Sequence, residues 1–330
     1  MRNEVFITKT AKFLPNNPVD NDHMEDYLGK IGGNPSRVRS IVLRQNGIKQ
    51  RYYALTTNQQ ITHTNAEMTA NAINNLFDEE VKLTDIELLA CGTSSPDQLL
   101  PSHTAMVHGL LKEHPVEIIS PSGVCLSSAH ALKAGYSYMK AGLVKNAVCA
   151  GSELSSGVLQ SKNYEEEYEK LTEVETKPLI AFEKDFLRFM LSDGAGAFLL
   201  EDKPRGDLSL RIDWIESISY ASETETCMFM GAEKRPDGEL KSWKEFTEQE
   251  WLDRSVFGIK QDIRLLDVKI IGFWIRHLKD CFTKHNINPA ADADYFIAHF
   301  SSMFFHDKLR DAMNENGIAV PYEKWFFNLP

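Results

Sequence analysis

The segment Ser120–Leu132 places a cysteine where a thiol can act as a nucleophile. It follows the short apolar run Val116–Ser120, and after Cys125 small or apolar residues recur every three or four positions, as on one face of a helix. The order strand, tight turn, helix predicts that Cys125 lies on the first turn of a buried helix. A thiol at a helix N-terminus lies near unpaired backbone N–H groups and the positive end of the helix dipole, which favour the thiolate.

The other four cysteines give weaker signals. A buried cysteine usually behaves as an inert small hydrophobic residue, and Cys125 would be read so without the strand-to-helix elbow around it. Cys91 and Cys149 lie inside apolar runs and are predicted core residues, whereas Cys227 and Cys281 have no supporting feature. No cysteines form a Cys-x-x-Cys pair or a zinc spacing with the ten histidines, so we predict no metal site and a reduced, cytoplasmic setting.

A thiolate nucleophile needs a proton acceptor or a positive partner. His299 is the best placed of the ten histidines, because it ends the apolar run Tyr295–Ala298 and open α/β sheets present their chemistry at strand C-terminal ends. A histidine in such a place is more often structural, and that alternative stays open from the residues alone. His130, five residues after Cys125, is expected to face elsewhere, and His306 is a weaker second candidate.

Short apolar runs alternate with helical patterns through the first two hundred residues, which predicts βαβ crossovers and a mixed sheet with helices on its faces. The predicted strands cover residues 87–91, 116–120, 146–150 and 195–200, and the predicted helices cover 65–77, 101–112 and 125–141. After Pro204 the order of elements restarts, with strands over 208–220, 295–299 and 325–329 and helices over 262–286 and 303–316.

Two loops carry candidate features, and two long stretches interrupt the order of elements. Residues 191–197 form a glycine-rich turn that lacks the Lys-Ser/Thr ending of a P-loop, so we interpret its glycines as letting backbone pass close to the nucleophile helix. Residues 93–102 follow a strand and open a helix at Pro101, where they line a site or cap that helix. Residues 156–190 and 221–261 are too long for ordinary connections and are either functional lids or insertions, or solvated surface helices.

Size and charge restrict the class of protein. A chain of 330 residues with 42% hydrophobic content can bury a large core, as one α/β unit or two fused halves. The formal charge of −11 argues against a nucleic-acid partner, and an acidic partner would need a local basic patch. We find no signal peptide and no apolar run of the roughly 18–20 residues that span a membrane. Because Trp325–Pro330 looks like a core strand, we expect the true C-terminus further on.

Five motifs, in order along nearly the whole chain, resemble the ketoacyl-ACP synthase III group of thiolase-fold condensing enzymes. They are Gly47-Ile48 with Arg51, the loop Thr93–Ser102, the stretch Ser122–Glu153 with the nucleophile helix, the Asp193–Ala197 turn, and His299 after its strand. Within the group, the phrase Phe186–Gly196 resembles the condensing enzymes of dialkylresorcinol and aryl-polyene pathways.

The resemblance implies an α/β, thiolase-like fold, with two similar βαβ-rich halves in a five-layer α-β-α-β-α arrangement. Residues 1–205 would form the N-terminal half with the nucleophile, and residues 206–330 the C-terminal half with the histidine, truncated at its end. It also implies a homodimer.

The resemblance further implies a Claisen condensation of acyl thioesters, in fatty acid or polyketide/dialkylresorcinol-type lipid biosynthesis. Cys125 would accept the acyl group, its backbone N–H would be one oxyanion-hole donor, and His299 would assist attack by a malonyl-derived carbanion. Thr93, Leu100 and Ser302 would contact substrate. Phosphopantetheine on acyl carrier protein or coenzyme A would deliver the acyl groups, and no cofactor is expected.

Several positions depart from the group's pattern. Its third catalytic residue, an Asn, would fall just after Pro330. Phe300-Ser301-Ser302 follows His299 in place of Gln-Ala-Asn, which argues against standard fatty-acid initiation. Ile41 stands where coenzyme A-using members carry a stacking Trp, which favours a carrier-protein donor or a different primer. Leu100 occupies the position of a bulky residue that the dimer partner inserts into the acyl pocket.

Lys308 and Arg310 are candidates for an acidic carrier-protein dock, with a solvated helix face as the alternative. Two alternative functions stay open: a thiolase-fold acyltransferase to oxygen, nitrogen or sulfur acceptors, and a catalytically silent partner subunit.

Overall fold

The computed structural model describes residues 3–112, 114–171, 185–206 and 208–327. Two compact units divide the chain, the first comprising residues 1–19, 52–157 and 192–215 and the second residues 20–51, 158–191 and 216–330. The division therefore differs from the predicted consecutive halves 1–205 and 206–330. Two segments of the predicted first half, residues 20–51 and 158–191, fold with the second unit.

A six-stranded mixed sheet forms the centre of the first unit. β4 pairs in parallel with both β5 and β6, and the remaining neighbours pair antiparallel. In order across the sheet the strands are β5 (Glu117–Ile119), β4 (Leu88–Gly92), β6 (Asn146–Glu153), β7 (Gly194–Glu201), β1 (Phe6–Phe13) and β8 (Leu210–Arg211).

The four strands predicted between residues 87 and 200 are confirmed. The strand predicted over 208–220 is confirmed only at β8, because Leu210 and Arg211 alone pair with β1. β1 itself was not predicted.

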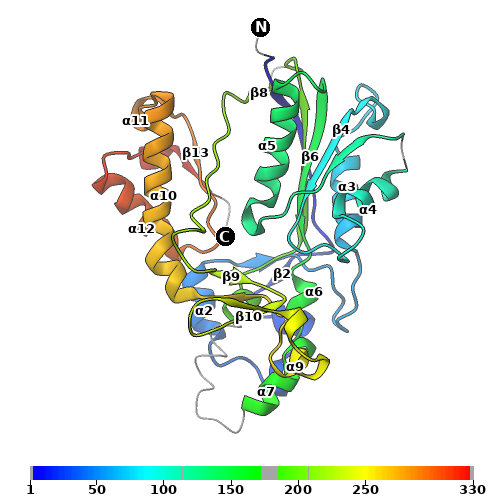
Figure 1. Cartoon of the computed structure of the whole chain (residues 1–330), viewed down its shortest axis with the longest axis vertical. Coiled ribbons are helices and arrows are strands. Elements are labelled where there is room, and N and C mark those ends of the chain that lie inside the picture. Colours follow the sequence, from blue (N-terminus) through cyan, green and yellow to red (C-terminus); the bar gives the residue numbers. More distant parts are fainter. Residues whose placement is uncertain (1–2, 113, 172–184, 207, 328–330) are drawn as a thin grey trace. The chain divides into compact units, whose positions relative to one another are not determined.

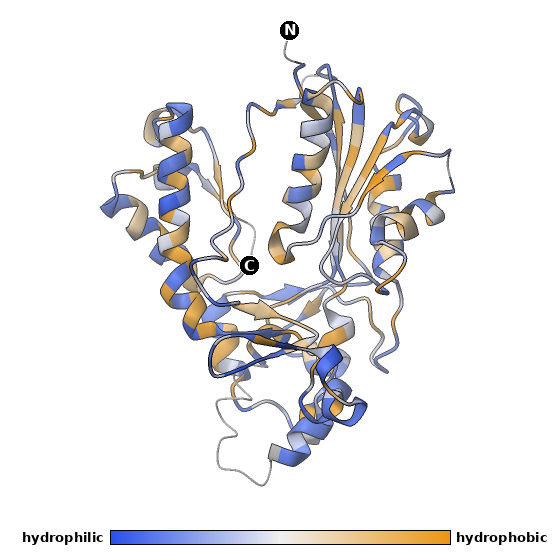
Figure 2. Ribbon diagram, viewed as in Figure 1, coloured by the Kyte–Doolittle hydropathy of each residue, from blue (hydrophilic) through white to orange (hydrophobic). Residues whose placement is uncertain are grey.

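Helices cover both faces of this sheet. Figure 1 shows α5 (Ser127–Lys140) on one face and α3 (Asn65–Asn74) with α4 (His103–Leu111) on the other. Successive residues of β4 alternate between the two cores: Leu88 and Ala90 pack on the α5 side, and Leu89 and Cys91 on the side of α3 and α4. A strand buried on both faces reads as a continuous apolar run, and the inner strands are coloured hydrophobic in Figure 2.

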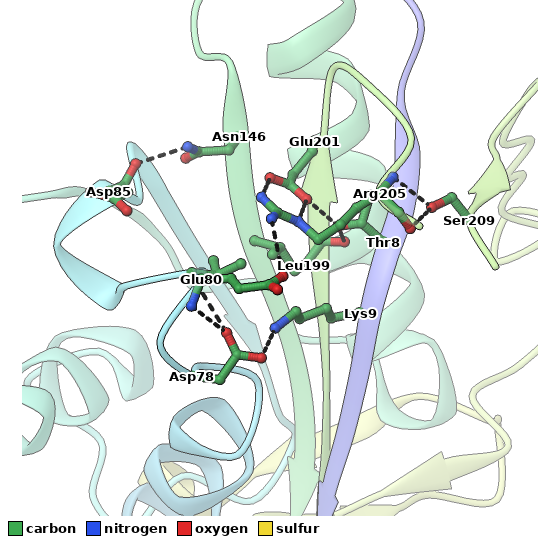
Figure 3. Close-up of polar contacts among 11 residues, drawn as sticks. Thr8, Lys9, Asp78, Glu80, Asp85, Asn146, Leu199, Glu201, Arg205 and Ser209 are labelled. Carbon is green, nitrogen blue, oxygen red and sulfur yellow. Dashed lines mark hydrogen bonds and ion pairs between the residues drawn. The ribbon is translucent and has the colours of Figure 1, made fainter. Parts of the chain in front are cut away.

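Hydrogen bonds and ion pairs between polar side chains connect β1 and β7 near the ends of these strands (Figure 3). Arg205 donates two hydrogen bonds to the carboxylate of Glu201, at 2.9 and 2.7 Å, and Thr8 Oγ1 donates to the same carboxylate at 2.6 Å. Lys9 of β1 pairs with Asp78. These contacts join β1 to β7 and to the turn that follows α3.

The second unit is mainly helical. Its largest helices are α10 (Ile263–His285) and α12 (Phe304–Glu315), which confirm the predictions for 262–286 and 303–316 and pack around a shared apolar core. β13 (Phe296–Ile297) and β14 (Trp325–Phe326) pair in parallel, and residues 328 and 329 of the predicted last strand lie outside the described residues. The smaller helices are α1 (Met24–Leu28), α2 (Arg39–Asn46), α7 (Glu165–Leu171), α9 (Glu248–Asp253) and α11 (Pro289–Asp292).

The two long interruptions are folded segments where the structure describes them. Residues 221–261 contain two small antiparallel pairs and α9, around a cluster of Trp243, Trp251 and Phe257 with ring centroids 5.6–5.8 Å apart. The pairs are β9 (Met228–Phe229) with β12 (Lys260–Gln261), and β10 (Ala232–Lys234) with β11 (Leu240–Ser242). Residues 156–190 contain α7 and, at their start, α6 (Ser156–Leu159). β2 (Val19–Asp20) and β3 (Gln50–Arg51) are two-residue strands at the two ends of the segment 20–51.

Candidate active site

The predicted nucleophile lies on a short turn between β5 and α5. Val124–Leu126 form a 3₁₀ helix, and the α-helix begins only at Ser127. Cys125 therefore lies two residues before the α-helix and not on its first turn, and it is exposed, not on a buried helix. Solvent exposure is what an attacking thiol needs.

The turn holds a β-branched residue in an unfavourable backbone conformation. Val124 has φ +51°, in the left-handed region that β-branched side chains rarely adopt. The hydroxyl of Ser127 opposes this strain by donating to the Val124 carbonyl at 2.9 Å and accepting from the Gly123 N–H at 3.1 Å. The buried Ser127 side chain thus closes the turn that presents Cys125.

Glycines let α5 lie directly on the sheet. A Cβ atom at Gly151 of β6 would stand 2.3 Å from Ser128 Cβ, and one at Gly135 would stand 2.5 Å from Cys149 Sγ. The predicted role of the 191–197 glycines beside this helix is wrong. The nearest neighbours of added Cβ atoms at Gly194 and Gly196 come from β1 and the residue that follows it.

The electrostatic setting of Cys125 differs from the prediction. Although the residue is exposed, the protein atoms around its thiol raise the pKa of Cys125 and the Glu153 carboxylate raises it further, while the backbone N–H of Cys125 lowers it. Within this unit, burial and the charge of Glu153 thus outweigh the lowering of the thiol pKa that was expected at a helix N-terminus. Burial also raises the pKa of Cys149 to about 12, as expected for a core cysteine.

Glu153 organises the loop next to the nucleophile turn. Its carboxylate accepts hydrogen bonds from the Ser94 N–H at 2.8 Å, the Ser95 hydroxyl at 2.5 Å and the Thr93 hydroxyl at 3.4 Å. Burial raises the pKa of Glu153, and these hydrogen bonds oppose the shift. The Ser94 hydroxyl in turn lies 3.1 Å from the Ser127 hydroxyl. The prediction missed Glu153, Ser94 and Ser127; a carboxylate three residues after the end of the predicted strand at 146–150 was the available signal.

Thr93 and Leu100 were predicted to contact substrate. Thr93 is buried, and its hydroxyl accepts from Asn65 Nδ2 at 2.8 Å while donating to Glu153, so it supports the loop. Leu100 is 84% exposed, and its neighbour Leu99 is 77% exposed. The helix expected to open at Pro101 begins at His103, with Ser102 as the residue before it. Substrate contact by Thr93 and Leu100 stays a prediction.

The second unit carries the predicted histidine. His299 lies two residues after the end of β13 and is exposed; protein atoms around its ring nevertheless lower its pKa, which favours the neutral, proton-accepting imidazole. Ser302 is fully buried, and its hydroxyl accepts from the Phe304 N–H at 3.2 Å and donates to the Gln45 carbonyl at 3.4 Å. Those bonds give Ser302 a structural role, and its contact with substrate stays a prediction. Cys125 belongs to the first unit and His299 to the second, so each is described with its own neighbours.

The other histidine candidates lie in packed surroundings. The His306 ring is buried among aromatic rings, with centroids 4.9 Å from Phe327 and 5.4 Å from Phe300. The prediction that His130 faces away from the nucleophile turn is wrong. Its Nδ1 would lie 3.0 Å from a Cβ built on Gly123, so its ring rests against that turn.

Two of the five motifs are structural supports. Arg51 is buried, donates to Asn21 Oδ1 at 2.5 Å and to the Phe189 carbonyl, and so anchors its own unit. Asp193 is buried and accepts from the Ala54 N–H at 2.7 Å and the Ser156 N–H at 2.8 Å, which fixes the start of β7.

The basic pair on α12 is engaged in ion pairs. Lys308 pairs with Asp267, and Arg310 pairs with Asp307 at 3.0 Å and Asp311 at 3.1 Å. This arrangement matches the solvated helix face kept as the alternative. Ile41 lies on α2 and is 40% exposed.

Among the described residues, no group of three or more His, Cys, Asp and Glu side chains could hold a metal ion. No helix among the same residues is long and apolar enough to cross a bilayer.

Solved structures with a similar fold cover nearly all of this chain. A tetronic acid condensing enzyme superposes with a TM-score of 0.72 at 17% identity over 98% of this chain and 84% of that one. The 3-oxoacyl-(acyl carrier protein) synthase III of Pseudomonas aeruginosa gives 0.64 at 15% identity over 98% and 83%. OleA of Xanthomonas campestris gives 0.65 at 14% identity over 100% and 86%. The chain therefore has the thiolase-like fold.

Sequence comparison identifies relatives within that fold. The beta-ketoacyl-[acyl-carrier-protein] synthase III of Neisseria gonorrhoeae is 29% identical over 156 residues, 46% of this chain and 45% of that protein. That of Haemophilus influenzae is 27% identical over 195 residues, 59% of this chain and 52% of that protein. The matches span about half the length of these curated relatives, and no protein-family model matches. About half of the chain is thus similar in sequence to synthase III enzymes, which confirms the resemblance; the dialkylresorcinol sub-group stays a prediction.

Proposed function

We propose that the protein forms a carbon–carbon bond by Claisen condensation of acyl thioesters, with Cys125 as the nucleophile that carries the acyl group. The observation that carries this proposal is an exposed thiol on a turn that buried hydrogen bonds hold in place, directly before a helix. The names of the relatives, beta-ketoacyl-[acyl-carrier-protein] synthase III, and of a structural neighbour, a tetronic acid condensing enzyme, support the same reaction class.

The proposed reaction has two steps. The Cys125 thiolate attacks the carbonyl carbon of an acyl thioester, the new C–S bond forms, and the donor thiol leaves with a proton. A carbanion at the α-carbon of a second thioester, formed by loss of CO₂ if that thioester is a malonyl derivative, then attacks the Cys125-bound carbonyl. The C–C bond forms as the Cys125 thiolate is expelled. His299 is the proposed proton acceptor or hydrogen-bond donor, and the Cys125 N–H one donor to the developing oxyanion.

We further propose that phosphopantetheine on acyl carrier protein or coenzyme A delivers the acyl groups, without another cofactor. OleA, a structural neighbour, has been crystallised with lauric acid and lauroyl-CoA, which supports acyl thioesters as the substrate class. The product would be a fatty-acid or dialkylresorcinol-type lipid precursor. We propose in addition that the protein is an enzyme of the acyltransferase class and that it acts as a homodimer in the cytoplasm.

Intact-protein mass spectrometry tests the first step. The wild-type chain and Cys125→Ala are incubated with a panel of acyl-coenzyme A and acyl-carrier thioesters of increasing chain length. Cys227→Ala, which removes a half-buried thiol far along the chain, is the matched control. We expect an acyl adduct on wild type and Cys227→Ala that is lost in Cys125→Ala.

A second incubation separates the alternative functions. Acyl-loaded enzyme is mixed with a malonyl-carrier thioester or with oxygen, nitrogen and sulfur acceptors. A 3-oxoacyl product supports condensation, whereas transfer to a heteroatom acceptor alone would assign a simple acyltransferase. No adduct from any donor on folded protein would contradict the proposal and favour the silent subunit.

A further inference from the structure

The hydrogen bonds around the nucleophile turn form one continuous chain that ends at a carboxylate. Ser127 holds the Gly123 and Val124 backbone, the Ser94 hydroxyl meets the Ser127 hydroxyl at 3.1 Å, and the Ser94 N–H donates to Glu153 at 2.8 Å. These five residues come from three segments of the first unit.

The capacity of the Ser127 hydroxyl fixes the direction of the central bond. A hydroxyl has one proton to donate and two lone pairs to accept with. The proton of Ser127 goes to the Val124 carbonyl, and one lone pair accepts from the Gly123 N–H. The Ser94 hydroxyl must therefore donate to the remaining lone pair. With that bond the Ser127 hydroxyl is fully satisfied, which suits a buried group.

The hydrogen-bond partners of the Glu153 carboxylate likewise fix its role, here as an acceptor. All three neighbours, the Ser94 N–H and the Ser95 and Thr93 hydroxyls, point donors at it. Ser95 and Thr93 are themselves engaged: Ser95 Oγ accepts from the Leu154 N–H at 2.9 Å, and Thr93 Oγ1 accepts from Asn65 Nδ2 at 2.8 Å. Only an acceptor fits at position 153, since the backbone N–H of Ser94 cannot reverse its role.

We propose that Glu153 is a positioning residue for Cys125, acting through the Ser94–Ser127 hydroxyl pair on the strained Val124 turn. The inference rests on the proposed role of Cys125 as nucleophile. Glu153 fixes Ser94, Ser94 fixes the hydroxyl of Ser127, and Ser127 fixes the backbone of Gly123 and Val124, the two residues directly before Cys125.

Two titratable side chains of the first unit surround the turn: Glu153 from β6, and His130 from α5, whose ring rests against Gly123. A pH-dependent readout therefore has to separate their contributions. The negative charge of Glu153 acts on the thiol through space, whereas its hydrogen bonds act through Ser94 and Ser127.

Alkylation of Cys125 by iodoacetamide across pH, followed by intact-protein mass spectrometry, separates position from charge. Ser94→Ala and Ser127→Ala keep the charge of Glu153 but break the hydroxyl chain. We expect the plateau rate constant at high pH to change by about threefold to tenfold with the midpoint nearly unchanged, because each loses a hydrogen bond that orders the turn. Glu153→Gln changes the plateau and also moves the midpoint to lower pH, because a like charge is removed. Glu153→Asp, which keeps the charge, restores the wild-type midpoint.

Controls keep the result interpretable. Ser152→Ala removes a buried hydroxyl beside Glu153 that bonds to Thr69 and His103, and we expect its profile to match wild type. His130→Gln measures the imidazole contribution. Wild-type plateaus in Ser94→Ala and Ser127→Ala, or a wild-type midpoint in Glu153→Gln, would overturn the proposal. Because iodoacetamide needs no acyl donor, failure of the acylation experiment leaves this test unaffected.

Discussion

A side chain at Gly92 would collide with the carbonyl oxygen of Ser127, since an ideal Cβ there would stand 2.1 Å from it. Gly92 ends β4, and Ser127 opens the helix that follows the nucleophile turn. Together with Gly151 and Gly135, the absence of a side chain at Gly92 sets how closely α5 approaches the sheet, and with it the position of Cys125.

Gly92→Ala is expected to destabilise the protein by about 1–3 kcal/mol, because backbone atoms on both sides of the overlap have to shift. Urea denaturation followed by circular dichroism measures the loss. Gly109→Ala is the matched control: Gly109 lies inside α4 with open space around its Cα. There alanine should stabilise the helix by about 0.5–1 kcal/mol. Equal effects at both positions would contradict the close-approach argument.

Val124→Asn is expected to stabilise the protein by about 1 kcal/mol. Val124 has φ +51°, and asparagine adopts the left-handed region with much less strain than a β-branched residue. Val268→Asn, an exposed position within α10, is the comparison, since a valine in an ordinary helical conformation releases no strain on substitution. The denaturant midpoints of the two variants test this expectation. A loss of stability in Val124→Asn would show that contacts of the valine side chain stabilise the protein by more than its backbone strain costs.

His103 makes stability depend on pH. It is buried, with Nε2 3.2 Å from Thr69 Oγ1 and 3.3 Å from Ser152 Oγ, and burial lowers its pKa from the ordinary 6.5 to about 4. Between these values the unfolded chain binds a proton that the folded chain excludes, so stability is full above pH 6.5 and falls as the pH drops towards 4. The part lost between pH 7 and 5 is about 2 kcal/mol.

His103→Gln removes that titration. Its free energy of unfolding should fall less than that of wild type between pH 7 and 5, by about the same 2 kcal/mol, even if the variant is less stable at pH 7. Urea titrations at a series of pH values measure both slopes. Parallel slopes would show that His103 keeps an ordinary pKa in the folded protein.

Arg188 should be among the most sensitive charged residues of the second unit. It is 1% exposed and donates to Asp185 at 3.0 Å and to the carbonyls of Leu159 and Gly29 at 3.0 and 2.7 Å. Arg188→Leu leaves a buried carboxylate without its cation, which costs about 3–5 kcal/mol.

Arg254→Leu provides the contrast to Arg188→Leu. Its pair with Glu233, at 2.9 Å, lies at the surface, where such pairs contribute about 0–1 kcal/mol. Thermal unfolding of both variants compares them. A similar loss in the two would mean that burial of the Arg188 pair contributes little.

Local patterns predicted much of the secondary structure. The apolar runs that become β4, β5, β6 and β7 and the periodic segments that become α3, α5, α10 and α12 are properties of adjacent residues. β1 was missed because its sequence, Phe-Ile-Thr-Lys-Thr-Ala-Lys-Phe, has no apolar run longer than two residues, and only its antiparallel pairing with β7 makes it a strand.

The sequence by itself determined the position of Cys125 between a strand and a helix and the resemblance to the synthase III enzymes, since both depend on residues in consecutive order. The tertiary structure alone decided that Glu153 reaches Ser94, that Ser94 reaches Ser127, and that Gly92 rather than the 191–197 turn admits α5. It also decided that the pKa of Cys125 is raised, because the protein atoms packed around the thiol, and after them the charge of Glu153, 28 positions further along the chain, come together only in the folded unit. Contacts between distant segments depend on how the sheet brings strand ends together, and this arrangement cannot be predicted from a local sequence pattern.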